Sequence, residues 1–225
     1  MILQNKIKID KIVRSKRKSI ALVIAPDATL IIRAPIRATL EYIEDLVFRK
    51  RLWIDKKRKQ ILKNGAPVEA KKFIGGEEFF YLGQIYRLKI EPIKNIRLAD
   101  YLYFPEKYLN KARARMIGWY KQKAREKITE RTVLFSRITG WKFKSILITS
   151  AESRWGSCGA MGSLNFTWKL IMAPPSVIDY VVVHELAHTV ERNHSARFWN
   201  KVATVLPDYK IRRKWLKDNG KKFKI

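Results

Sequence analysis

The chain has 225 residues, of which 47% are apolar and 30% are charged, and its formal net charge is +28. Its length allows one large domain or two small ones, and its composition is typical of a soluble globular protein. No apolar run approaches the roughly 18–20 residues of a membrane-spanning helix, and the start "MILQNKIKIDKIVRSKRKS" is unlike a secretory signal. We therefore expect a cytoplasmic protein with no membrane segment. The single cysteine, Cys158, cannot form an internal disulfide and agrees with that location.

Three short strands and one helix are predicted for the start of the chain. The strands are expected in "KIKIDKIV" and "IALVIAPDATLIIRAP", with a turn at "APDAT" between the second and the third. Apolar residues at helical spacing predict a single helix from about Arg37 to Lys63, capped by Thr39. Further along, "EEFFYLGQIYRLKIEP" predicts a hairpin around Leu82-Gly83-Gln84, and "NIRLADYLYFP" predicts another strand or strand pair.

Pro105 is the predicted boundary between a strand-rich N-terminal region, 1–105, and a second region, 106–225. A long basic helix is predicted directly after it. The inward face of that helix is expected to consist of Ala112, Met116, Trp119, Tyr120 and Ala124. Strands are predicted at "SILITS" and "SLNFTWKLIMA", and Pro174-Pro175 is expected to open another helix. These elements together indicate an α+β fold.

All three histidines of the chain lie within eleven positions of "VVVHELAHTVERNH". His184 and His188 are four residues apart, so on a helix they lie within about 40° of each other, one turn apart, and can bind one metal ion. Glu185 projects about 100° around the helix, which suits a group beside a metal-bound water. The pattern HExxH combines two zinc ligands with a general base, so Glu185 is the candidate catalytic residue. Zinc would acidify the water, and Glu185 would pass the proton to the leaving group.

A catalytic zinc ion usually takes three protein ligands, and His194 is the candidate for the third. The chain must turn to bring it back, and Arg192-Asn193 can supply the turn because Asn tolerates the left-handed conformation. Ser195 would then cap the next helix. Glu191 is a competitor on the same helical face, but it lies about 10.5 Å further along the axis than His184. A distant carboxylate is another alternative, in which case His194 would orient substrate.

The stretch "SAESRWGSCGAMGSLNFTW" places a tryptophan among small residues. One interpretation is a hairpin turn around a buried tryptophan. The other is a strand and turn along the zinc cleft that binds an extended peptide by strand addition, with Arg154 holding a carboxylate or a phosphate. Under the second interpretation, the candidate substrate-binding residues are Arg154, Trp155, Ser157 and Asn165.

Several of these motifs together resemble those of one family. They are Ser153–Cys158 ("SRWGSC"), Leu164-Asn165, the helix with His184 and His188, Asn193-His194-Ser195 with Phe198-Trp199, and upstream "YLGQIYRLKI". The chain resembles the YgjP-like metal-dependent hydrolases, which are relatives of the SprT-like and Wss-type metalloproteases. The resemblance covers most of the chain and is strongest from Ser153 to Trp199.

The resemblance implies a zincin-like catalytic region preceded by a β-rich N-terminal region. It implies zinc as the cofactor, His184, His188 and His194 as its ligands, and Glu185 as the catalytic acid and base. It also implies metallopeptidase activity, although some members of the family are described as nucleoside triphosphate pyrophosphatases that act on UTP.

Three functions are therefore weighed. A zinc-dependent metallopeptidase acting on a peptide or protein is the leading hypothesis, because HExxH is an arrangement that peptide-bond hydrolysis uses. A nucleotide phosphohydrolase is favoured by the excess of Lys and Arg, but carboxylates that could hold Mg²⁺ are sparse around the motif. The third is a protease recruited to nucleic acid through its basic surface. The sequence does not indicate an oligomeric state.

Overall fold

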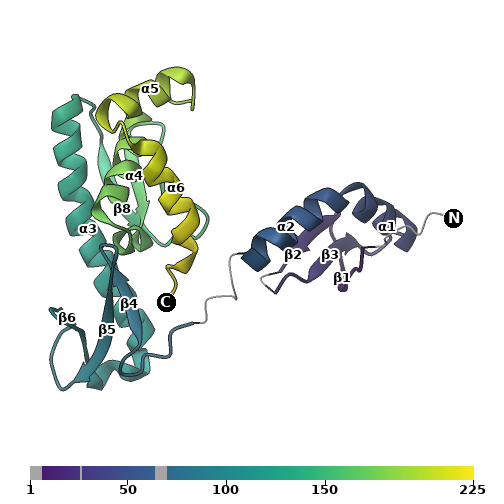
Figure 1. Cartoon of the computed structure of the whole chain (residues 1–225), viewed down its shortest axis with the longest axis horizontal. Helices are drawn as coiled ribbons and strands as arrows, with labels where there is room; N and C mark the ends of the chain where they lie inside the picture. Colours follow the sequence, from purple (N-terminus) through teal and green to yellow (C-terminus); the bar gives the residue numbers. More distant parts are fainter. Residues whose placement is uncertain (1–6, 26, 64–69) are drawn as a thin grey trace. The chain divides into compact units, whose positions relative to one another are not determined.

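The computed structural model of the chain describes residues 7–25, 27–63 and 70–225. The chain divides into two compact units, Met1–Val68 and Glu69–Ile225 (Figure 1). Both combine strands with helices, so the α+β class expected from the sequence is confirmed.

The first unit is a three-stranded sheet with two helices. The sheet has the order β1-β3-β2, in which β1 (Lys11–Ser15) is parallel and β2 (Ala21–Ile24) is antiparallel to the central β3 (Leu30–Pro35). Every second residue of β3 from Leu30 to Ala34 is buried, as the pleat of a strand requires. The three strands predicted here are confirmed, and Asp27 in the turn between β2 and β3 accepts hydrogen bonds from Thr29.

The single helix predicted over 37–63 is wrong, because the structure has two: α1 (Leu40–Arg49) and α2 (Arg51–Lys63). Thr39 caps α1 as predicted, since its hydroxyl accepts a hydrogen bond from the Tyr42 N–H at 3.3 Å. The helix breaks at Lys50, whose ψ is 9°. Ile43, Val47 and Ile54 would lie on one face of a straight helix as well, within about 40° of one another, so their periodicity does not reveal the break.

The second unit contains two sheets and the helices that pack on them. In chain order its elements are β4 (Glu78–Tyr81), β5 (Gln84–Glu91), β6 (Arg97–Leu98), β7 (Leu102–Pro105), the 3₁₀ segment η1 (Glu106–Lys111), α3 (Ala112–Thr139), β8 (Ser145–Thr149), β9 (Gly156–Cys158), β10 (Ser163–Thr167), the 3₁₀ segment η2 (Trp168–Met172), α4 (Pro175–Ala187), α5 (Ala196–Val205), α6 (Tyr209–Asn219) and the 3₁₀ segment η3 (Gly220–Lys222).

The first of these sheets has the order β4-β5-β7-β6. β4 and β5 form the predicted hairpin around Leu82-Gly83, and the predicted strand pair is β6 with β7. Phe79, Leu88 and Leu102 of this sheet share a buried core with Met116 and other residues of α3. Residues 70–105 therefore pack with the C-terminal part of the chain, and the compact units divide after Val68, whereas the sequence predicted a boundary at Pro105.

The predicted inward face of α3 is confirmed, because all five of its residues are buried. The helix itself starts at Ala112 and is preceded by η1, so the first turn after Pro105 is 3₁₀ rather than α. Among the described residues, no helix combines the length and the apolar character needed to cross a bilayer. The cytoplasmic location stays a prediction.

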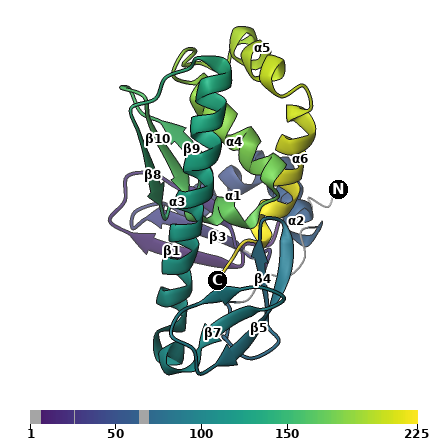
Figure 2. The same ribbon diagram turned by 90° about the vertical axis from the view of Figure 1, so that its left-hand side faces the viewer.

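The second sheet has the order β8-β10-β9, and α4 packs against both β9 and α3 (Figure 2). "SLNFTWKLIMA", predicted as one strand, is β10 followed by η2. The reason is tertiary: the carbonyls of Ile171 and Met172 accept hydrogen bonds from Leu82 and Gly83 in the turn between β4 and β5. Helix α4 starts at Pro175 as predicted.

We predict that Tyr120→Phe lowers the free energy of unfolding by about 1–3 kcal/mol. Tyr120 is buried and its hydroxyl donates to the carbonyl of the partly buried Phe80 at 2.7 Å, so its removal leaves that carbonyl without this donor. Urea denaturation measures the change. The matched control is Tyr86→Phe, whose hydroxyl bonds the exposed Gln84 side chain at 2.9 Å and should change stability by less than about 0.5 kcal/mol. Equal losses in the two variants would contradict the assignment.

Candidate functional site

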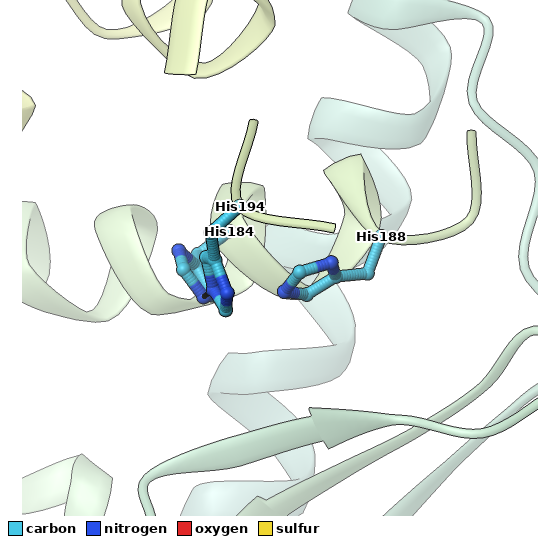
Figure 3. A group of neighbouring side chains, drawn as sticks. All are labelled: His184, His188 and His194. Atoms are coloured by element: carbon cyan, nitrogen blue, oxygen red, sulfur yellow. Dashed lines mark hydrogen bonds between the residues drawn. The ribbon is translucent and has the colours of Figure 1, made fainter. Parts of the chain in front are cut away.

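Helix α4 and the turn that follows it bring the three histidines together. His184 lies in α4, His188 caps its C-terminus, and His194 directly precedes Ser195, the N-cap of α5. One ring nitrogen of each histidine lies within 4.8 Å of the others, and the His184 and His194 Nε2 atoms are 3.0 Å apart. Figure 3 shows the ring of His188 pointing toward the other two. We call these three residues the histidine cluster.

The turn that returns His194 differs from the expected one. Asn193 does not adopt the left-handed conformation, since the described non-glycine residues with positive φ are Ala28, Phe73 and Leu82. Helix α4 ends at Ala187 instead, and the next N–H groups bond the Leu186 and Ala187 carbonyls. The predicted cap of α5 is confirmed, because the Ser195 hydroxyl accepts from the Phe198 N–H at 3.3 Å.

Glu191 contributes to the cluster through its backbone. Because α4 ends before it, Glu191 does not share the helical face of His184. Its carbonyl lies 3.1 Å from His188 Nδ1, which can donate to it. A metal-binding histidine usually holds its second ring nitrogen in this way, which leaves the Nε2 lone pair for the ion. Among the described residues, the group of potential metal ligands at this place is the histidine cluster, without the Glu191 carboxylate.

The spacing of the cluster fits a tetrahedral metal ion. Two nitrogens bound at 2.0–2.1 Å to one zinc ion lie about 3.3–3.4 Å apart, and the 3.0 Å between the His184 and His194 Nε2 atoms is close to this distance. The protonation states fit as well. Burial, with the charges of His188, His194 and Arg213, lowers the pKa of His184 to about 3, and burial also lowers the pKa of His188. The His184 and His188 imidazoles are therefore neutral at pH 7, the form that binds metal.

Glu185 is buried beside the cluster, with 6% of its surface exposed. Burial raises the pKa of its carboxyl to about 8, and the positive charge of Arg154 opposes this shift. The side chain lies against Gly156 of β9: a Cβ there would be 2.6 Å from Glu185 Cγ and Oε1. A glycine is therefore required at this position, because any side chain would displace the Glu185 carboxylate or the strand.

A cavity of about 440 Å³ lies beside His184 and Glu185, and we call it the α4–α6 cavity. Its lining includes Trp155, Tyr180, Arg213 and Lys217. Burial raises the pKa of Tyr180 to about 12, and the charge of Arg213 opposes this shift. One feature of the sequence indicates that Tyr180 lies near the site: it precedes His184 by four residues on α4, so the two share a helical face. The sequence offered no such feature for Arg213 and Lys217, which come from α6.

The four predicted substrate-binding residues are divided between two cavities. Trp155 lines the α4–α6 cavity, where its ring packs against Phe223 at 6.0 Å. Arg154, Ser157 and Asn165 line a second cavity of about 360 Å³ on β9 and β10. Gly156 borders both cavities, so the two spaces adjoin at β9.

The half-buried Cys158 shows no sign of an activated nucleophile. Burial raises the pKa of its thiol, and the nearby Glu185 raises it further against the opposing charge of Arg192. A thiol that is neutral at pH 7 is a weak nucleophile.

The match to one protein-family model agrees with this site. A family model described as "YgjP-like, metallopeptidase domain" matches residues 18–219. No curated protein matches the chain. Among solved structures, the crystal structure of the metallopeptidase zymogen of Pyrococcus abyssi abylysin is similar, with 20% sequence identity and a TM-score of 0.37. The match covers 40% of this chain and 93% of that one.

We predict that Gly156→Ala lowers the free energy of unfolding by about 1–3 kcal/mol, because the methyl group overpacks the contact between β9 and Glu185. Thermal or urea unfolding measures the loss. Gly159→Ala is the control in the same segment, since a Cβ there would meet its nearest atom, the Ser163 carbonyl oxygen, at an ordinary 3.5 Å. A Gly156→Ala protein as stable as the control variant would refute the close approach.

Proposed function

The chain belongs to the YgjP-like metallopeptidase family, and we propose that it is a zinc-dependent peptidase with the histidine cluster as its metal site. The observation that carries the proposal is the convergence of three imidazole nitrogens next to a buried carboxylate. His184 of this cluster and Glu185 both line the α4–α6 cavity. Three histidines are a known ligand set of catalytic zinc, which leaves a fourth position for water or substrate. Other first-row ions also bind imidazole, so zinc is a proposal within the metal-binding assignment.

His184, His188 and His194 would hold the ion. When bound, zinc supplies a water of lowered pKa and polarises the substrate carbonyl. We assign the proton transfers to Glu185: its carboxylate accepts the proton of the attacking water and delivers it to the departing amine. The burial of Glu185 supports this role, because a carboxyl with a raised pKa both takes up and releases a proton near neutral pH.

The position of β9 supports an extended peptide as substrate. β9 pairs with β10 on one side and is the edge strand of its sheet. An edge strand offers unpaired backbone groups to which a peptide can add as a further strand. In this proposal Arg154, Ser157 and Asn165 bind substrate along β9 and β10, and Trp155 closes one end of the α4–α6 cavity.

The two other functions weighed from the sequence stay predictions. Phosphoanhydride hydrolysis commonly uses carboxylates that hold Mg²⁺, and among the described residues that line the α4–α6 cavity Glu185 is the one carboxylate. Recruitment to nucleic acid rests on the net charge of +28 alone.

Glu185→Gln should retain the metal and lose about 10²–10⁴-fold in turnover, because the amide cannot accept the proton of water. Metal analysis and the cleavage of casein, run beside a nucleoside triphosphate panel that includes UTP, measure both effects. The control is Glu191→Gln: its carbonyl, not its carboxylate, contacts the cluster, so activity should be unchanged. Undiminished casein cleavage by Glu185→Gln would remove Glu185 as the acid and base. Metal-dependent triphosphate hydrolysis with casein left intact would overturn the peptidase proposal.

His194→Ala should weaken zinc binding by at least about 100-fold, because it removes a direct ligand and changes of outer-shell partners alone cost 10–100-fold. Competition with a chromophoric chelator measures the affinity. Asn193→Ala serves as the neighbouring control and should bind zinc as the unmodified protein does. Full zinc occupancy of His194→Ala would mean that another residue is the third ligand.

A further inference from the structure

The part of the α4–α6 cavity wall that α6 forms is basic, and His184 lines the same cavity. Arg213 and Lys217 line it and are four residues apart on α6, so they lie on one face of that helix, one turn apart. Leu216, which is buried with 6% of its surface exposed, also lines the cavity and packs this face of α6 into the core.

Two neighbouring cations on α6 form ion pairs with nearby aspartates. Arg212 pairs with Asp208 at 2.9 Å, and Lys214 pairs with Asp218 at 2.9 Å. No ion pair within the described part of the chain involves Arg213 or Lys217. Within the cavity, the carboxylate available to them is that of Glu185, to which the proposed function assigns proton transfer. The basic wall therefore has charge left for a ligand.

The basic wall is held in place by aromatic packing. The guanidinium carbon of Arg213 lies 4.9 Å from the centre of the Trp199 ring, and that ring stacks on His194 at 5.6 Å. At the other end of α6, Gly220 lies against Trp155, since a Cβ there would be 2.4 Å from Trp155 Cζ2. Both contacts tie α6 to residues of the site, and the first holds the exposed Arg213 guanidinium beside Trp199. The exposed Lys217 side chain lies one turn further along the same helix.

We propose that Arg213 and Lys217 make the enzyme selective for peptides that carry an aspartate or glutamate side chain beside the scissile bond. This inference rests on the proposed peptidase function. Arg offers a planar fork that matches a carboxylate, and Lys adds a point charge. Trp155, Val181 and Leu216 provide apolar surface for the methylene groups of the side chain. The walls of a cavity also focus the field of such charges more than an open surface does.

The test compares pairs of peptides that differ only by Glu against Gln at one position. The positions are chosen from the sites at which the unmodified, zinc-loaded protein cuts an unbiased peptide library. We expect the library to show acidic residues enriched beside the cut, and kcat/KM for the Glu peptide to exceed that for the Gln peptide by about tenfold, mainly through KM.

Arg213→Gln combined with Lys217→Gln should abolish that ratio, and Arg213→Glu should invert it in favour of a Lys peptide. Lys214→Gln is the matched control, since Lys214 is on the same helix, is 78% exposed at its side chain and pairs with Asp218. It should leave the ratio at about tenfold. Arg213→Lys, which keeps the charge, should retain most of the preference, and thermal unfolding verifies that each variant is folded.

The outcomes separate this inference from the proposed function. Cleavage of Glu and Gln peptides at equal rates, lost in Glu185→Gln, would leave the peptidase intact and overturn the selectivity. Absence of peptide cleavage by the zinc-loaded protein would overturn both. Hydrolysis of UTP that requires Arg213, with peptides left intact, would also overturn both, because the two cations would then serve a phosphate chain.

Discussion

The burial of α4 is the constraint on which the rest of the site depends. The helix packs against α3, α5, α6 and β9, and its residues from Val181 to Ala187 are buried apart from the partly exposed His184. Two acidic residues lie in it. Asp179 forms a bidentate ion pair with Arg131 of α3 at 2.5 and 2.8 Å, whereas Glu185 is enclosed by β9 and forms no such ion pair with any of the described residues. Burial of a charge without a close partner is costly, so an uncompensated carboxylate in this position points to function rather than stability.

Desolvation by burial shifts the pKa values of both a histidine and a carboxyl group at this site toward the values that metal chemistry requires. It lowers the pKa of His184 and raises that of Glu185, so both charges are disfavoured in the folded chain. Neutral imidazoles are the ligand form of histidine, and a carboxyl that titrates near neutrality suits proton transfer. The requirement for glycine at position 156 follows from this arrangement, since β9 can enclose Glu185 only if the strand carries no side chain there.

The lining of the α4–α6 cavity comes partly from β9 and partly from α6, and the two elements offer different chemical groups. β9 offers an edge of backbone groups, and α6 offers two cations without ion-pair partners. Trp155 connects these two elements. It directly precedes β9, and its ring packs on Gly220 and Phe223, which follow α6. The partly buried Trp155 ring therefore packs on the C-terminal segment and lines the α4–α6 cavity at the same time. Its binding of substrate stays a proposal.

The sequence by itself determined what depends on local chemistry. The HExxH helix, the caps at Thr39 and Ser195, the hairpin at Leu82-Gly83 and the buried face of α3 all follow from short spacings and side-chain propensities, which act over one or two turns.

Tertiary structure alone decided the break at Lys50, the early end of α4 at Ala187 and the conversion of the strand after Thr167 into η2. It also decided that Arg213 and Lys217 stand beside His184. The conversion into η2 depends on partners far along the chain, the Leu82 and Gly83 N–H groups, and the periodicity of a single segment carries no information about such partners.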